Sequence, residues 1–117
     1  MLYRISRCFL LAGSVSLLIS SQSFAAGVDA DAAKALAKDN GCFKCHAIDK
    51  TKKGPSYQKI ATKYKDKDKA EARDKLIKNI TTAPMVKLED GTEEEHKVID
   101  TKDPKKIQNL VDWILSQ

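Results

Sequence analysis

Two cysteines and a histidine form the stretch of this sequence whose residue types and spacing indicate the most specific chemistry. The stretch reads Cys42-Phe43-Lys44-Cys45-His46. Thiols separated by two residues can each add to a vinyl group of haem, and the histidine that follows is then placed to bind the iron from one face. The pattern therefore predicts one covalently attached haem c, held by Cys42 and Cys45, with His46 as the proximal axial ligand.

Other uses of a Cys-X-X-Cys pair fit this chain less well. A disulfide is compatible with an exported protein. A thioredoxin-like redox site requires a strand–helix–strand setting, whereas helical patterns flank this pair. A zinc site requires two further ligands, and besides His46 the only histidine is His96. We therefore favour haem.

The first 25 residues have the features of a cleavable export signal. Arg4 and Arg7 precede an apolar run from Phe9 to Ile19, and small residues end the segment at Ser23 and Ala25. The apolar run is shorter than the roughly 20 residues that span a bilayer. We expect cleavage near Ala25, a periplasmic location, no membrane anchor after cleavage, and a single domain over residues 26–117.

The composition of residues 26–117 is thin for a protein core. These residues include 16 Leu, Ile and Val, together with Phe43 and Trp113. Small scaffolds with so little apolar material usually need a ligand or a covalent staple. A buried porphyrin would supply the missing apolar centre, which is an argument for haem that does not depend on the cysteine motif.

The charge balance excludes one class of partner. The formal net charge is +5, and it becomes +3 when Arg4 and Arg7 leave with the signal. This balance, with lysines that are not interleaved with aromatic residues, does not indicate nucleic-acid binding. Lysines near the edge of the haem could instead steer an acidic redox partner.

Capping residues and apolar spacing predict four helices. They run from Asp29 or Asp31 to Gly41, from Ser56 to Tyr64, from about Lys69 to Asn79, and from Asp103-Pro104 onward. The last carries the apolar stripe Ile107, Leu110, Val111 and Ile114 and should pack on the first. Residues 81–102 lack a helical period, and Asp90-Gly91 suggests a short hairpin there. The patterns predict an all-α fold of three to five helices around one haem.

A glycine–proline pair follows the polar loop after His46. Gly54-Pro55 marks a turn. A histidine that binds a metal normally donates its other ring N–H to a carboxylate or a backbone carbonyl. Pro55 has a carbonyl and no N–H, so its carbonyl is a candidate partner for His46.

Taken together, these features resemble a class I monohaem cytochrome c of the short bacterial type. The resemblance rests on the CFKCH motif directly after the first helix, on Gly54-Pro55, and on the order of the remaining elements. It implies a small all-α fold around one haem. It also implies a one-electron carrier that is not an enzyme and that exchanges electrons with redox proteins, and we expect it to be a monomer.

The sequence leaves two main candidates for the sixth ligand of the iron. Ala83-Pro84-Met85 resembles the approach to the methionine ligand of that family, but Met85 precedes Trp113 by 28 residues. His96 precedes Trp113 by 17 residues, which fits the family's shorter spacing better. We favour His96, with Met85 as the alternative. An open or exogenously filled sixth position is a third option, and Lys87 and Lys97 are minor ones.

Two other functions correspond to a haem iron whose sixth ligand is weak or absent. A weak, displaceable sixth ligand would suit binding or sensing of CO, NO or O2. An open iron position with His96 as an acid–base group would suit a weak peroxidase. Both require a coordination position that a simple electron carrier keeps closed.

Overall fold

The computed structural model of the chain describes residues 27–117, so the predicted signal peptide at residues 1–25 lies outside the described residues. The described elements follow in the order α1 (Ala30–Asp39), η1 (Cys42–Lys44, a turn of 3₁₀ helix), α2 (Tyr57–Tyr64), α3 (Lys69–Thr81), β1 (Met85–Lys87), β2 (Glu93–Glu95) and α4 (Pro104–Leu115). The prediction of a mostly helical fold with a hairpin between residues 81 and 102 is confirmed. Between residues 27 and 117, no helix is long and apolar enough to cross a membrane.

Each of the four α-helices begins at a side chain that accepts a hydrogen bond from a backbone N–H of the first turn. Asp29 accepts from the Ala32 N–H, and Ser56 accepts from the Lys59 N–H. Asp68 and Asp103 cap α3 and α4 in the same way. The caps at Ser56 and Asp103 are those that the sequence predicts. The third helix ends at Thr81, two residues beyond its expected end.

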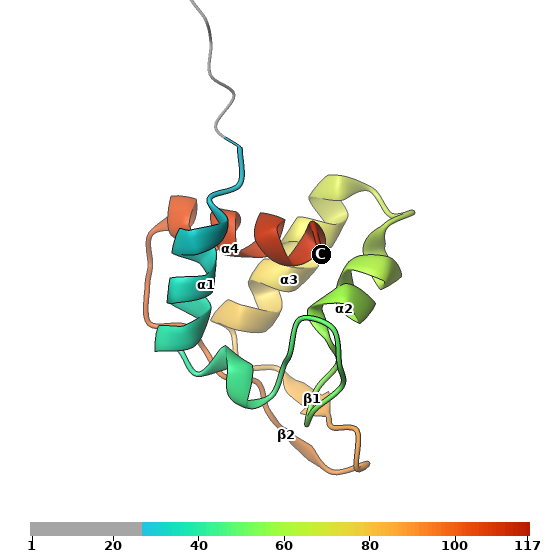
Figure 1. The fold of residues 1–117 in the computed structure, drawn as a ribbon. Coiled ribbons are helices and arrows are strands. Elements are labelled where there is room, and N and C mark those ends of the chain that lie inside the picture. The colour runs from blue at the N-terminus through green and yellow to red at the C-terminus, as the bar shows by residue number, and fades with distance from the viewer. Residues whose placement is uncertain (1–26) are drawn as a thin grey trace, which may run out of the picture.

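Helix α4 is the centre of the fold, because it packs against α1, α2 and α3 (Figure 1). Its apolar stripe is buried as predicted, and the largest fully buried side chains are Trp113, Leu110 and Val111. Ala33 and Ala37 of α1 are 1% and 0% exposed. Their small size lets α1 approach α4 closely, which brings the Cys42 end of α1 next to the core.

The β1–β2 hairpin extends from this helical body and lies beside the loop that follows His46 (Figure 1). The strands are antiparallel, with Val86 opposite Glu94, and Gly91 takes the positive φ of 87° that the turn requires. The Glu89 N–H donates to the Lys53 carbonyl oxygen at 3.0 Å. The hairpin is therefore held against the polar loop.

The close approach of α1 to α4 predicts how the interface responds to a larger side chain. Ala37→Leu should lower the free energy of unfolding by about 1–3 kcal/mol, because the added atoms have no space between the two helices. Chemical denaturation of the holoprotein measures this change. Ala35→Leu on the exposed face of the same helix is the matched control and should change little; equal losses in both variants would contradict the packing described above.

Candidate haem site

The CFKCH stretch leaves α1 through a tight turn. Gly41 has a φ of 70°, in the left-handed region, and this allows the chain to reverse directly after the helix. The His46 N–H then donates to the Cys42 carbonyl oxygen at 3.0 Å, and the Cys45 N–H donates to the same oxygen at 3.2 Å. These bonds place Cys42, Cys45 and His46 on one wall of a cavity.

The ring of His46 is held in one orientation by the backbone. Its Nδ1 lies 2.6 Å from the carbonyl oxygen of Pro55. Because a carbonyl oxygen only accepts, Nδ1 carries the proton and Nε2 has a free lone pair. Burial lowers the pKa of His46, with the Pro55 carbonyl acting in the opposite direction. The neutral imidazole that results is the form that binds a metal.

Two neighbours fix the same ring by packing. The Tyr57 ring stacks on it, with centroids 5.4 Å apart and an angle of 23° between the planes. On another side lies Gly54, where a Cβ would come within 2.9 Å of the His46 Cε1 atom. The Gly54-Pro55 pair therefore contributes both the space and the hydrogen-bond acceptor that this histidine uses.

The cavity has a volume of about 960 Å³, near the upper end of the roughly 300–1,000 Å³ of typical ligand sites. Apolar side chains from three helices and from the chain before α4 line it: Ile60, Leu76, Ile80, Ile99, Leu110 and Ile114. Two thiols and a neutral imidazole lie at its wall. An apolar cavity with this donor set fits a haem, and it explains why so few side chains form a solid core.

The two candidate sixth ligands lie in different environments. His96 lines the cavity, and its ring centroid is 6.2 Å from that of His46, with 36° between the planes. Its Nδ1 lies 2.9 Å from the Lys97 carbonyl oxygen, so Nδ1 is the donor of this bond. Met85 does not line the cavity and is 60% exposed on β1. The structure thus brings His96, and not Met85, to the cavity that His46 also lines.

Sequence reasoning did not identify the roles of Gly54, Tyr57 and Asn40 in this site. The sequence indicated Gly54 as a turn residue and Tyr57 as a core residue, but no local pattern shows that both contact the His46 ring. Asn40 is 3% exposed and also lines the cavity. Its position before Gly41 predicts the end of a helix. It does not predict that the side chain contacts a residue far along the chain.

Residues 30–117 match the protein family Cytochrome c. Among curated proteins, the cytochrome c-551 of Pseudomonas aeruginosa is 40% identical over 58 residues, which is 50% of this chain and 56% of that protein. The chain therefore spans somewhat more than half the length of this curated relative.

Solved structures agree over a longer stretch. The class 1 cytochrome MtoD from Sideroxydans lithotrophicus ES-1 superimposes with a TM-score of 0.70 and is 57% identical, covering 77% of this chain and 97% of MtoD. The wild-type cytochrome c552 of Nitrosomonas europaea gives a TM-score of 0.55 at 30% identity, over 71% of this chain and 96% of that one. These matches confirm the predicted fold and cofactor: the chain carries one covalently attached haem c.

The contact between Gly54 and His46 predicts the effect of a single added methyl group. Gly54→Ala should lower the free energy of unfolding of the holoprotein by about 1–3 kcal/mol, because the Cβ and the His46 ring cannot occupy their present positions together. Chemical denaturation followed by haem absorbance measures it. Gly27→Ala is the control, since no atom lies within 4 Å of a Cβ at that position; an unchanged Gly54→Ala protein would count against the packing around His46.

Proposed function

Because the chain belongs to the cytochrome c family, we propose that it is an exported, periplasmic one-electron carrier whose haem iron is bound by two histidines, His46 and His96. The haem is attached through Cys42 and Cys45 and supplies the one-electron couple. The observation that carries the proposal is that two imidazole rings line the cavity with their centroids 6.2 Å apart.

The separation of these rings supports the ligand assignment. A metal–imidazole bond is about 2 Å long, so two imidazoles on opposite sides of one metal ion have centroids roughly 6 Å apart. The centroids of His46 and His96 are 6.2 Å apart. Both rings also have Nδ1 next to a backbone carbonyl, that of Pro55 for His46 and that of Lys97 for His96. Such partners select the tautomer that leaves Nε2 free for a metal.

Met85 is a poor alternative on geometric grounds. Side chains alternate between the two faces of a strand, and its neighbour Val86 lines the cavity while Met85 is largely exposed. Bringing the thioether to the cavity would require the strand to shift by one residue, with loss of the Val86–Glu94 register. A second imidazole also stabilises oxidised iron better than a thioether, so this carrier should have a lower potential than a histidine–methionine one.

The same geometry supports electron transfer over the other two functions considered. A carrier requires both axial positions to be filled in both oxidation states, so that little reorganises when one electron moves. In this proposal His46 and His96 fill the two positions, and the Nδ1 of each ring is held by a backbone carbonyl oxygen. Gas sensing and peroxidase activity require an open or readily opened position, and nothing in the placement of His96 favours one.

Removing each candidate ligand separately tests the assignment. His96→Ala should convert the low-spin spectrum to one of an open site, and added imidazole should restore it. Met85→Ala is the matched control and should keep the wild-type spectrum and potential. Absorption and electron paramagnetic resonance spectra of both oxidation states measure this. Loss of the low-spin spectrum in Met85→Ala alone would show that the assignment is wrong.

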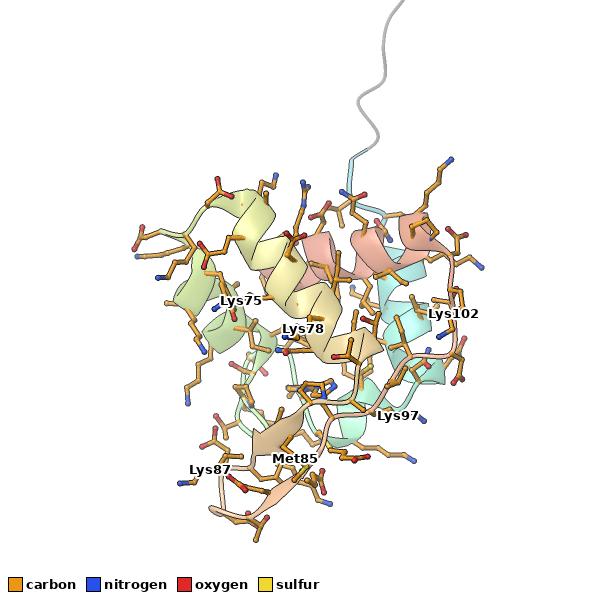
Figure 2. The ribbon with its side chains drawn as sticks, turned by 180° about the vertical axis from the view of Figure 1, so that it is seen from behind. Lys75, Lys78, Met85, Lys87, Lys97 and Lys102 are labelled. Carbon is orange, nitrogen blue, oxygen red and sulfur yellow. The ribbon has the colours of Figure 1, made fainter. Side chains whose placement is uncertain are left out.

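Several exposed lysines near the cavity indicate the kind of redox protein that would dock there. Lys75 and Lys78 of α3, Lys87 of β1, and Lys97 and Lys102 lie on the face seen in Figure 2, with Met85 among them. Within residues 27–117 none of these five lysines forms an ion pair. Lys87 and Lys97 also line the haem cavity. We propose that this lysine face docks a redox protein with an acidic surface, because opposite charges steer such encounters.

A carboxylate-terminated monolayer on a gold electrode serves as a defined acidic surface for testing this face. The double variant Lys75→Glu/Lys78→Glu should adsorb less and exchange electrons more slowly at low ionic strength, with a weaker salt dependence. Lys34→Glu/Lys38→Glu on α1 changes the net charge equally and should behave more like the wild type. Equal losses in the two double variants would show that only net charge matters.

A further inference from the structure

Asn40 is a buried polar residue that joins two distant parts of the chain. It lies at the end of α1, two residues before Cys42, and is 3% exposed. Its Nδ2 donates to the Leu36 carbonyl oxygen at 3.0 Å. Its Oδ1 accepts a hydrogen bond of 2.8 Å from the Asp100 N–H, 60 residues along the chain.

The contact with Asp100 is not needed to end the helix. The backbone N–H groups of Asn40 and Gly41 already bond to the carbonyls of Leu36 and Lys38, and Gly41 takes the left-handed conformation. These bonds already satisfy the backbone N–H groups at the helix end, so capping does not require the side-chain oxygen of Asn40. What the side chain adds is a bond from the helix that precedes the haem motif to the segment that follows His96.

That segment, residues 96–100, has three hydrogen-bonded anchors. The His96 N–H donates to the Pro84 carbonyl oxygen at 2.8 Å, and the Ile99 N–H donates to the Ile80 carbonyl oxygen at 3.0 Å. Those two anchors tie the segment to the chain around the hairpin and to α3. Among the hydrogen bonds of residues 27–117, the bond to Asn40 is the one that ties it to α1.

The separation of the two histidines depends on these anchors. His46 follows α1 and η1, whereas His96 lies on the segment between β2 and α4. The hairpin makes few contacts with the helices, and a backbone bond from Glu89 to Lys53 holds it to the loop after His46. The bond between Asn40 and Asp100 adds a direct connection between the parts of the chain that carry the two rings.

We infer that Asn40 is a positioning residue that holds His96 opposite His46 and thereby limits how readily an external ligand displaces His96. The inference rests on the ligand assignment proposed above. If the Asn40–Asp100 bond is lost, the state in which His96 is detached becomes more populated. An external ligand that competes for the same position then binds more tightly in proportion to that population.

Cyanide binding to the oxidised holoprotein tests the inference. Asn40→Ala should bind cyanide about fivefold more tightly than the wild type, the factor that corresponds to one hydrogen bond of about 1 kcal/mol. Asn40→Asp keeps an oxygen that can accept from the Asp100 N–H, so it should retain an affinity close to that of the wild type. If Asn40→Ala does not retain haem, Asn40→Ser, whose side chain is too short to reach Asp100, carries the same expectation.

Asn109→Ala is the matched control, because it should lower the stability of the protein without moving His96. Asn109 makes a similar pair of long-range bonds, accepting from the Asp29 N–H and donating to the Asp29 carbonyl oxygen, each at 2.9 Å. It does not line the cavity. Both alanine variants should lower the free energy of unfolding, and only Asn40→Ala should change cyanide affinity. Equal cyanide affinities in Asn40→Ala and wild type, or an equal rise in Asn109→Ala, would overturn the inference.

His96→Ala separates this inference from the ligand assignment. In the His96→Ala background, a further Asn40→Ala change should have no effect on cyanide affinity, because the residue it positions is gone. If His96→Ala binds cyanide no more tightly than the wild type, the ligand assignment itself is wrong. If His96→Ala binds it much more tightly while Asn40→Ala alone does not, the assignment stands and the role of Asn40 is wrong.

Discussion

The hydrogen bond between His46 Nδ1 and the Pro55 carbonyl oxygen is the interaction on which the site depends. It selects the tautomer and the orientation of the ring, so that Nε2 keeps a free lone pair. The neighbouring residues serve the same end, since Gly54 leaves room for the ring and Tyr57 stacks on it. A metal ligand held by three contacts needs little rearrangement when the charge of the metal changes.

The small amount of apolar material in the chain explains the shape of the fold. The helices pack on α4 around a small core of buried side chains, and they leave a cavity lined by further apolar groups. Alanines on α1 allow the helix that carries the haem motif to lie directly on α4. The cofactor thus completes the core of the protein as well as performing its chemistry.

The segment that carries His96 is held in place differently from the segment that carries His46. His46 lies within a continuous stretch of helix, turn and loop whose contacts are local in sequence. His96 lies on an extended segment held by hydrogen bonds to Pro84 and, through Asp100, to Asn40. The ligand assignment proposed above therefore implies that exchange at His96 depends on bonds formed far from the iron, whereas His46 is held by its immediate neighbours.

Much of this protein could be predicted from sequence because the signals are local. The spacing of Cys42, Cys45 and His46, the caps at Ser56 and Asp103, and the Asp90-Gly91 turn each depend on residues a few positions apart. The match of residues 30–117 to the cytochrome c family agrees with these signals. The choice between His96 and Met85 could not be made from local signals. Spacing along the chain shows how far a side chain can reach, but not whether it points toward the cavity.

Short-range patterns in the sequence are enough to predict the cofactor and the helices, and they make His46 the expected proximal ligand. Which of the two candidate side chains lines the cavity together with His46 depends instead on the tertiary structure. The register of β1 and β2 turns Met85 outward, and the anchoring of residues 96–100 turns His96 inward. Both depend on contacts between residues that are distant in the chain, such as Asn40 and Asp100, which no local pattern records.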